Sequence, residues 1–308
     1  MTTSKLSELL GGAARRALTK LGVPEQKVLA YWRIARFDKP IGTFLVLWPM
    51  LWALWIASEG VPSLDLFVIF VLGAVVMRAA GCVINDIADR DIDGHVERTK
   101  SRPLAAGEIS LKESIIFFAV LCGIALGLVL CLNLTTIYWS FGALALAILY
   151  PFMKRHTYLP QVFLGAAFAW SIPMAFAAVN ESVPTIAWLI FMATLIWTVA
   201  YDTIYAMIDR DDDLKIGVKS TAILFGPADR AIIAFLQVLV VLSLCLIGDQ
   251  LKLGQFYFLS VVMASILFVY QQHLIRWRYK DECFKAFLNN NWIGAAVFFG
   301  IFFNYLVR

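Results

Sequence analysis

Charged residues are scarce in this chain. Only 16% of its 308 residues are Asp, Glu, Lys or Arg, whereas 61% are hydrophobic. Because soluble globular domains carry about 25% charged residues, this composition excludes an ordinary soluble protein and indicates an integral membrane protein. The Lys and Arg residues lie beside apolar runs and form no soluble basic face, so we expect no nucleic-acid partner.

Residues that bind soft metals or form disulfides are also few. The chain has three histidines, which are scattered, and five cysteines, with no Cys-x-x-Cys pair among them. The odd cysteine count and the absence of that pair argue against a disulfide framework and against a zinc site. We interpret the cysteines as small residues of membrane helices.

What the chain has instead is a series of apolar runs. A helix needs roughly 17–25 such residues to cross the hydrocarbon core of a bilayer. Nine runs of near-spanning length follow residue 40, at 41–58, 64–85, 114–133, 135–152, 159–180, 184–208, 231–248, 254–274 and 291–307. They predict an all-α, multi-pass membrane protein with nine transmembrane helices around a central cavity, in a single domain over residues 39–308.

Residues 1–38 are polar enough to precede the membrane. Leucine and alanine recur at helical spacing over residues 6–21, which predicts an amphipathic helix on the membrane surface. With the N-terminus cytoplasmic, 23 Lys and Arg fall on the cytoplasmic side of the nine helices and two on the other side. This asymmetry follows the positive-inside rule and predicts that orientation. Arg78 is the one cation within an apolar run.

Two aspartate-rich stretches interrupt the apolar pattern, at GCVINDIADRDIDGHVERTKSRPLAAG (81–107) and YDTIYAMIDRDDDLKIGVKSTAILFG (201–226). Each has an Asp-Arg-Asp core, a later Lys-Ser pair and a glycine seven residues after that lysine. Carboxylates cost free energy near a bilayer, so we interpret both stretches as functional. Similar half-sites in two parts of a chain are a recurring membrane architecture.

Helical register sorts these aspartates into columns. At 100° per residue, one sector of about 80° holds Arg78, Asn85, Asp89 and Asp93, with Asp86 at its border. Asp91 points away from that sector. In the second stretch a sector of about 40° holds Asp202, Asp209 and Asp213. Asp211 points to the opposite side, so Asp91 and Asp211 are interpreted as solvated.

Oxygen-only ligands favour a hard cation, and carboxylates beside a phosphate-bearing substrate favour Mg²⁺. Neither Cys nor His accompanies them, which argues against zinc. We therefore predict that the two columns face each other and form one metal and diphosphate site. Nearby cations are candidates for holding diphosphate oxygens, although such residues also serve as topology determinants: Lys100, Arg102, Lys154, Arg155, Lys215 and Lys219.

These motifs resemble a known family. NDIADRDID is similar to the NDxxDxxxD motif of the UbiA superfamily of intramembrane aromatic prenyltransferases, and YDTIYAMIDRDDD resembles that family's second motif. RFDKPIGTFLVLWP, MRAAGCVIND, RTKSRPLAAG, YPFMKRHTYLPQ and DDDLKIGVKSTAILFG resemble its 4-hydroxybenzoate branch, which acts in ubiquinone synthesis. The similarity covers the chain from about residue 30 onward.

The resemblance implies Mg²⁺-dependent transfer of a polyprenyl chain from its diphosphate to the ring carbon ortho to the hydroxyl of 4-hydroxybenzoate. It places the protein in a bacterial inner membrane, with the mitochondrial inner membrane as the alternative. It implies catalytic, metal-holding roles for Asp89, Asp93, Asp209 and Asp213, with Asn85 as a further metal ligand. Asp86 and Asp202 are then supporting ligands.

The remaining roles follow from the substrates that the resemblance implies. Diphosphate binding is expected of Lys100, Arg102, Lys154 and Lys219. Arg155 is the first candidate for the benzoate carboxylate, with Arg36 and Arg78 behind it. An allylic carbocation needs shielding, for which the aromatic candidates are Trp48, Tyr150, Trp170, Trp197, Tyr201 and Tyr205.

Three alternatives stay open. Another family member could act on homogentisate, a dihydroxynaphthoate or haem, since the aspartate motifs concern only the diphosphate. A CDP-alcohol phosphotransferase is disfavoured, because Asp93-Gly94 does not continue into that group's pattern and no aspartate pair follows Gly107. A cation transporter is disfavoured because the aspartates lie at helix ends beside cations. The tail length, the oligomeric state and the base that removes the ring proton are not predicted.

Overall fold

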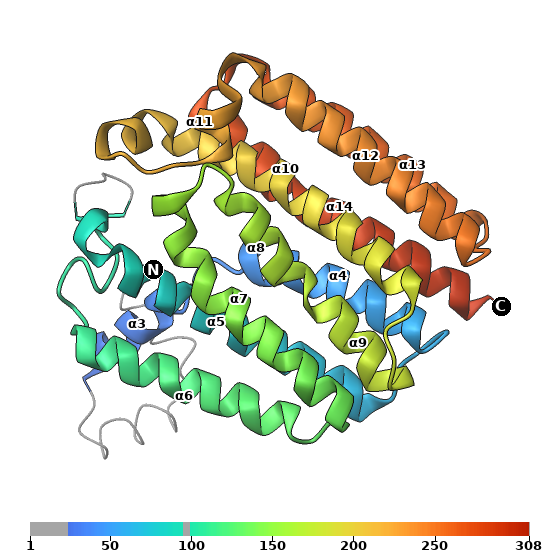
Figure 1. Cartoon of the computed structure of the whole chain (residues 1–308). Coiled ribbons are helices and arrows are strands. Elements are labelled where there is room, and N and C mark those ends of the chain that lie inside the picture. Colours follow the sequence, from blue (N-terminus) through green and yellow to red (C-terminus); the bar gives the residue numbers. More distant parts are fainter. Residues whose placement is uncertain (1–23, 95–98, 308) are drawn as a thin grey trace. The chain divides into compact units, whose positions relative to one another are not determined.

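The computed structural model describes residues 24–94 and 99–307, and every regular element within those ranges is a helix (Figure 1). The predicted amphipathic helix over residues 6–21 lies outside the described residues. Eight helical stretches in the described part are long and apolar enough to cross a membrane, and α4 (Ile41–Ala57) is a shorter apolar helix of 17 residues. The prediction of an all-α, multi-pass membrane protein is confirmed. The central cavity stays a prediction.

The helices follow the predicted runs closely at their apolar ends. After a short helix α3 (Glu25–Ile34), the spanning elements are α4, α5 (Leu64–Asp93), α6 (Leu111–Val129), α7 (Leu134–His156), α8 (Pro160–Ala169), α9 (Ser171–Asn180), α10 (Thr185–Ile216), α12 (Asp229–Gln250), α13 (Gln255–Leu274) and α14 (Lys280–Leu306). A short helix α11 (Thr221–Phe225) precedes α12.

Three helices extend well beyond the predicted runs. α5 continues from residue 85 to Asp93, α10 continues from residue 208 to Ile216, and α14 begins at Lys280 rather than at 291. The additional turns are polar, so a search for apolar runs misses them. Both aspartate motifs are consequently helical, as their register required.

One predicted run, 159–180, is two helices. α8 ends at Ala169 and α9 begins at Ser171, with Trp170 between them. Pro173 explains the break, because proline lacks the N–H that would bond the carbonyl of Ala169 and its ring clashes with that carbonyl.

The chain forms two compact units. The first comprises residues 1–40 and 76–125, and the second comprises residues 41–75 and 126–308. The predicted division at residues 38 and 39 stays a prediction.

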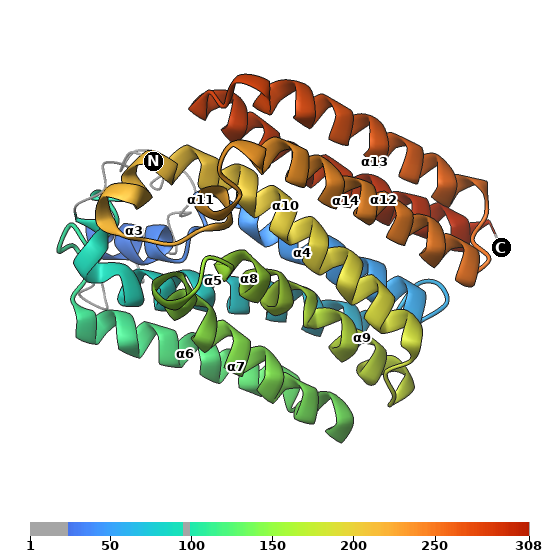
Figure 2. The same cartoon turned by 45° about the horizontal axis from the view of Figure 1, so that its top comes forward.

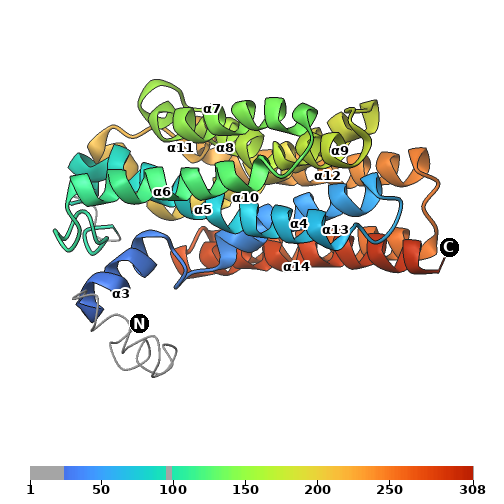
Figure 3. The same cartoon turned by 90° about the horizontal axis from the view of Figure 1, so that it is seen from below.

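In the second unit, α10 and α14 are the most buried of the long apolar helices. Figures 1 and 2 show α10, α12, α13 and α14 side by side, and α4 lies along α14 (Figure 3). Gly294 allows the close approach of α4, because the side chain of Trp48 occupies the space that a Cβ at this position would take. Trp52 adds a hydrogen bond from Nε1 to the carbonyl oxygen of Gly294, at 3.0 Å.

Three successive asparagines of α14, residues 289–291, tie this helix to three others. In sequence order, their side-chain oxygens accept hydrogen bonds from Gln271 of α13, Trp197 of α10 and Trp48 of α4, at 3.1, 2.9 and 2.9 Å. Successive residues of a helix point about 100° apart, so each asparagine bonds to a different neighbouring helix. Small residues and interhelical hydrogen bonds hold membrane helices together where apolar burial offers little selectivity. α14 therefore fixes the position of α10, which carries the second aspartate motif.

The first unit has its own apolar cluster. Ile34 of α3, Val83 of α5 and Ile109 of the segment before α6 are each almost fully buried in it. Tyr31 and Phe117 meet edge to face with ring centroids 5.0 Å apart. This packing brings α3, the end of α5 and the start of α6 together around the first aspartate motif.

Candidate functional site

The first motif occupies the last two turns of α5. Asp86, Asp89 and Asp93 are 1%, 2% and 5% exposed, and Asn85 is half-buried. Asp91 is exposed and lies 3.3 Å from the Nε of Arg90. The helical register thus separates the aspartates as the sequence predicted, with Asp91 on the solvated side.

Two arginines neutralise two of the three buried carboxylates, Asp86 and Asp93. The Nη2 of Arg36 donates to both oxygens of Asp86, at 2.7 and 2.9 Å. The Nη1 of Arg102 donates to both oxygens of Asp93, at 3.0 and 2.8 Å, and lies 3.2 Å from Asp86 Oδ1. Buried carboxylates are costly without such compensation. The sequence did not predict these pairs, because no spacing pattern connects residues 36, 86 and 102.

The segment between α5 and α6 positions Arg102. Thr99 Oγ1 donates to the carbonyl oxygen of Asp93 at 2.9 Å, and the backbone N–H of Arg102 donates to that of Thr99 at 2.8 Å. At the other end, Ser110 and Glu113 form a reciprocal capping box that starts α6, with the Ser110 N–H donating to Glu113 at 2.8 Å. Both ends of the segment are therefore fixed to helices.

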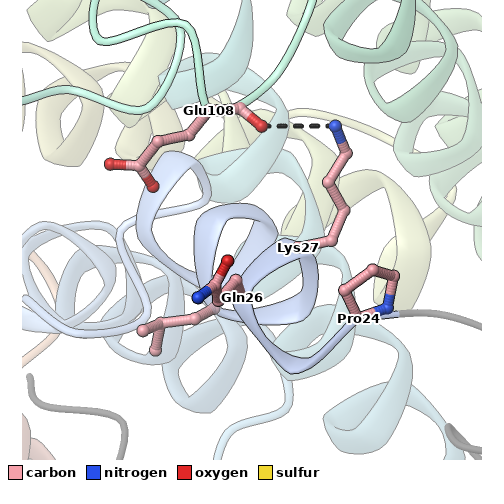
Figure 4. Close-up of a pocket in the computed structure, with 5 residues that line it drawn as sticks. Pro24, Gln26, Lys27 and Glu108 are labelled. Atoms are coloured by element: carbon pink, nitrogen blue, oxygen red, sulfur yellow. Dashed lines mark hydrogen bonds between the residues drawn. The ribbon is translucent and has the colours of Figure 1, made fainter.

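Helix α3 holds the same segment from the side. Arg33 donates to the Glu108 carboxylate at 2.9 Å and to the carbonyl oxygen of Ser101 at 2.6 Å. Lys27 pairs with Glu113 at 2.8 Å and donates to the carbonyl oxygen of Glu108 at 3.2 Å (Figure 4). A pocket of about 340 Å³ lies beside this contact. Its lining contains none of the predicted site residues: Pro24, Gln26, Lys27, Leu29 and Glu108.

The second motif occupies the last turns of α10. Asp202, Asp209 and Asp213 are half-buried and Asp211 is exposed, again as the register predicted. Gly217 ends the helix in a left-handed conformation (φ 74°), and its N–H donates to the carbonyl oxygen of Asp213. Glycine adopts this conformation without the steric cost of a Cβ.

A buried carboxylate that the sequence analysis missed anchors this end of α10. Asp229, at the start of α12, is fully buried and lies 3.2 Å from Arg210 of the second motif. Arg278, in the turn before α14, donates to Asp229 at 2.6 Å and to the carbonyl oxygen of Pro227 at 2.9 Å. The hydrogen bonds that Arg278 donates to Asp229 raise the pKa of the Arg278 guanidinium, which stays charged.

The end of α7 meets the chain after α10. The backbone N–H of Lys219 donates to the carbonyl oxygen of Lys154 at 3.0 Å, and the Lys219 ammonium lies 3.4 Å from the carbonyl oxygen of His156. Lys219 also stands over the ring of Tyr158, 5.5 Å from its centroid. The structure therefore brings Lys154 and Lys219 together, with Arg155 exposed on the same helix end.

The remaining predicted residues lie elsewhere. Arg78 is half-buried within α5 and its Nη1 contacts Cys82 one turn on, and Lys100 is exposed. In residues 24–94 and 99–307, no three Asp, Glu, His or Cys side chains stand grouped as a metal cage. The roles assigned to the site residues, and the facing of the two columns, stay predictions.

The fold and these helix ends define an integral membrane protein with two aspartate motifs, each at the polar end of a long helix. The chain belongs to the UbiA prenyltransferase family, whose profile matches residues 46–301.

Curated relatives cover nearly the whole chain. A 4-hydroxybenzoate octaprenyltransferase from Hahella chejuensis is 62% identical over 278 residues, which are 90% of this chain and 93% of the relative. One from Yersinia enterocolitica is 58% identical over 282 residues, or 92% and 98% of the two chains.

Solved structures agree on the fold. The apo structure of a UbiA homolog from Aeropyrum pernix superposes with a TM-score of 0.75 at 26% identity, covering 84% of this chain and 96% of that one. A UbiA homolog from Archaeoglobus fulgidus bound to GPP and Mg²⁺ gives 0.67 at 21% identity, over 91% and 100% of the chains.

Proposed function

We propose that this protein transfers a polyprenyl chain from polyprenyl diphosphate to the ring carbon ortho to the hydroxyl of 4-hydroxybenzoate, the chemistry of ubiquinone synthesis. The observation that carries the proposal is the 56–62% identity to 4-hydroxybenzoate octaprenyltransferases across about nine-tenths of both chains. The names of the same relatives support an octaprenyl donor.

The donor set fits a hard divalent cation such as Mg²⁺. Asp89 and Asp93 on α5, with Asn85, and Asp209 and Asp213 on α10 offer only oxygen atoms, one helical turn apart. When bound there, the metal would neutralise the charge that develops on the leaving diphosphate. The A. fulgidus homolog bound to GPP and Mg²⁺ supports a divalent metal in this fold.

Lysine and arginine side chains hold the diphosphate oxygens that the metal and its aspartates do not contact. Lys154 and Lys219, joined by a backbone hydrogen bond, offer two ammonium groups to diphosphate oxygens. The segment after α5 offers the ammonium group of Lys100 and the guanidinium of Arg102. Arg155, exposed beside Lys154, binds the carboxylate of 4-hydroxybenzoate. The other candidates for binding this carboxylate are Arg36, which already pairs with Asp86, and Arg78.

An aromatic column on α10 leads to the second motif. Trp197, Tyr201 and Tyr205 precede Asp209 at four-residue steps, and the Trp197 and Tyr201 ring centroids lie 5.5 Å apart. Phe287 of α14 packs against Tyr205 with centroids 4.7 Å apart. Aromatic faces stabilise a nearby cation. This column shields the allylic cation from water until the electron-rich ring attacks it.

The charge asymmetry supports the orientation that we propose for the protein in the membrane. We place the protein in a bacterial inner membrane with the N-terminus and both motifs on the cytoplasmic side, because 23 cations lie on that side and two on the other. Reporter fusions test this placement. A reporter after residue 100 or 215 is expected to be cytoplasmic, and one after Lys252 periplasmic. The reverse pattern would contradict it.

The acceptor is tested by reconstituting the purified protein with Mg²⁺ and octaprenyl diphosphate. Equal amounts of 4-hydroxybenzoate, homogentisate, a dihydroxynaphthoate or haem are supplied in separate reactions. Mass spectrometry is expected to find 3-octaprenyl-4-hydroxybenzoate and no product from the other acceptors. A product with one of the others and none with 4-hydroxybenzoate would move the protein to another branch of the family.

A further inference from the structure

Four charged side chains of the first unit alternate in sign along one chain of contacts: Arg36, Asp86, Arg102 and Asp93. They come from α3, α5 and the segment between α5 and α6. Their side chains are 19%, 1%, 17% and 7% exposed. Charges this well shielded interact more strongly than surface ion pairs, so each contact has an energetic consequence.

The two aspartates of this chain differ in how they are held. Asp86 has guanidinium groups on two sides, with Arg36 bound through both carboxylate oxygens. Asp93 is held at both of its oxygens by a single nitrogen, the Nη1 of Arg102. If Arg102 leaves, Asp86 keeps a neutralising partner, whereas Asp93 needs another cation.

Arg36 is fixed by a second contact of its own guanidinium. Its Nη1 donates to the carbonyl oxygen of Arg33 at 2.8 Å, so the side chain caps the end of α3 while Nη2 binds Asp86. Its backbone φ of 58° is rare for a residue with a side chain and follows this folding back on its own helix. Arg36 and Asp86 together make a fixed support against which Arg102 rests.

The oxygens of Asp93 that Arg102 occupies are those that would bind the metal of the proposed function. We propose that Arg102 is an exchangeable counter-ion. Without metal it neutralises Asp93, and when a divalent cation takes Asp93 the guanidinium turns from that carboxylate to the incoming diphosphate. Asp86, held by Arg36, is the support of this exchange and not a metal ligand. The inference rests on the proposed function, because the metal and the diphosphate belong to it.

The charges balance in both states. In the metal-free state one guanidinium offsets one carboxylate. In the loaded state the dication replaces it at Asp93, and the released guanidinium adds a positive charge where the diphosphate brings negative ones. Arginine suits both partners, because its planar fork bonds carboxylates and phosphates in the same way. Arg102 therefore opposes metal binding alone and favours metal binding with diphosphate.

Binding of Mn²⁺, measured by electron paramagnetic resonance, tests this proposal without turnover. The full-length protein in nanodiscs is titrated with Mn²⁺, first alone and then with inorganic diphosphate. We expect Arg102→Gln to bind Mn²⁺ alone about tenfold more tightly than the wild type, which corresponds to about 1.4 kcal/mol. Diphosphate should strengthen Mn²⁺ binding by a larger factor in the wild type than in this variant.

Arg90→Gln is the matched control. It removes the same charge from within the motif itself, but Arg90 pairs only with the exposed Asp91 in the described contacts. We expect its Mn²⁺ affinity to stay within about twofold of the wild type, as befits a solvent-screened pair. If Arg90→Gln tightens Mn²⁺ binding as much as Arg102→Gln does, the loss of any nearby positive charge explains the tighter binding. The proposed exchange of Arg102 for the metal at Asp93 is then wrong.

Arg102→Lys is the second variant, used if Arg102→Gln does not fold. Lysine retains the charge but is a point donor, so we expect an intermediate Mn²⁺ affinity. Equal or weaker Mn²⁺ binding by Arg102→Gln, or by Arg102→Lys where the first is unfolded, overturns the proposal. So does a lack of Mn²⁺ binding in every variant. Product formation by the wild type is measured separately, and its failure would overturn the proposed function instead.

Discussion

Arg278 holds Asp229 through both Nε and Nη2, with nitrogen–oxygen distances between 2.6 and 3.1 Å, and Asp229 is completely buried. The pair joins the turn before α14 to the start of α12. Arg210, near the end of α10, donates a hydrogen bond to the same carboxylate at 3.2 Å. One buried aspartate thus anchors the helix that carries the second motif.

Replacing Asp229 by asparagine leaves two arginines facing a neutral group. The arginine side chains are 37% and 23% exposed, so water screens part of the uncompensated charge; Asp229→Asn should cost about 1–3 kcal/mol and unfold at a lower temperature in detergent. Asp249→Asn is the control, because Asp249 and its partner Lys252 are both largely exposed. Its unfolding temperature should match the wild type. An unchanged unfolding temperature for Asp229→Asn would show that the anchor does not contribute to stability.

The hydrogen bond from Trp197 to Asn290 fixes α10 against α14. Asn290→Leu leaves the buried indole N–H without this acceptor, which costs about 1–3 kcal/mol. In a Trp197→Phe background the same change should cost much less, since no N–H remains to satisfy. A double-mutant cycle from the four unfolding free energies measures this coupling. Additive effects of the two substitutions would contradict it.

Alanine substitutions at Gly294 and Gly127 should change the stability of the protein in different directions. A Cβ at residue 294 would meet the Trp48 side chain, so Gly294→Ala should destabilise the protein by about 1–3 kcal/mol. At Gly127 of α6 no atom lies within 4 Å of the added Cβ. Gly127→Ala should be neutral or slightly stabilising, because alanine favours a helix. The two unfolding temperatures are compared in the same detergent. Equal changes would show that α4 can yield at this contact.

The apolar pattern predicted the fold to within a few residues at most helix ends, because the bilayer fixes how long an apolar helix must be. It failed where helices continue as polar turns, at the ends of α5 and α10 and the start of α14. The break at Trp170 was also missed, although Pro173 signals it.

Helical register predicted which aspartates are solvated, since burial follows the helix period. It could not predict the partners of Asp86, because Arg36 is 50 residues away and only tertiary packing brings it near. The sequence did not identify Asp229 as a buried anchor for the same reason. Its partners Arg210 and Arg278 are 19 and 49 residues distant in sequence.

We propose that Asp89 and Asp209, one from each motif, hold the reacting diphosphate through metal. The most direct measurement is product formation from octaprenyl diphosphate and 4-hydroxybenzoate by Asp89→Asn and Asp209→Asn. Asp91→Asn and Asp211→Asn, changed on the solvated sides of the same helices, are the controls. We expect each of the first two to lose at least about a hundredfold in rate, as expected when charge stabilisation of a transition state is removed, while staying folded in the membrane. The controls should stay within about twofold of the wild type. Near-normal product formation by either Asp89→Asn or Asp209→Asn would contradict the account.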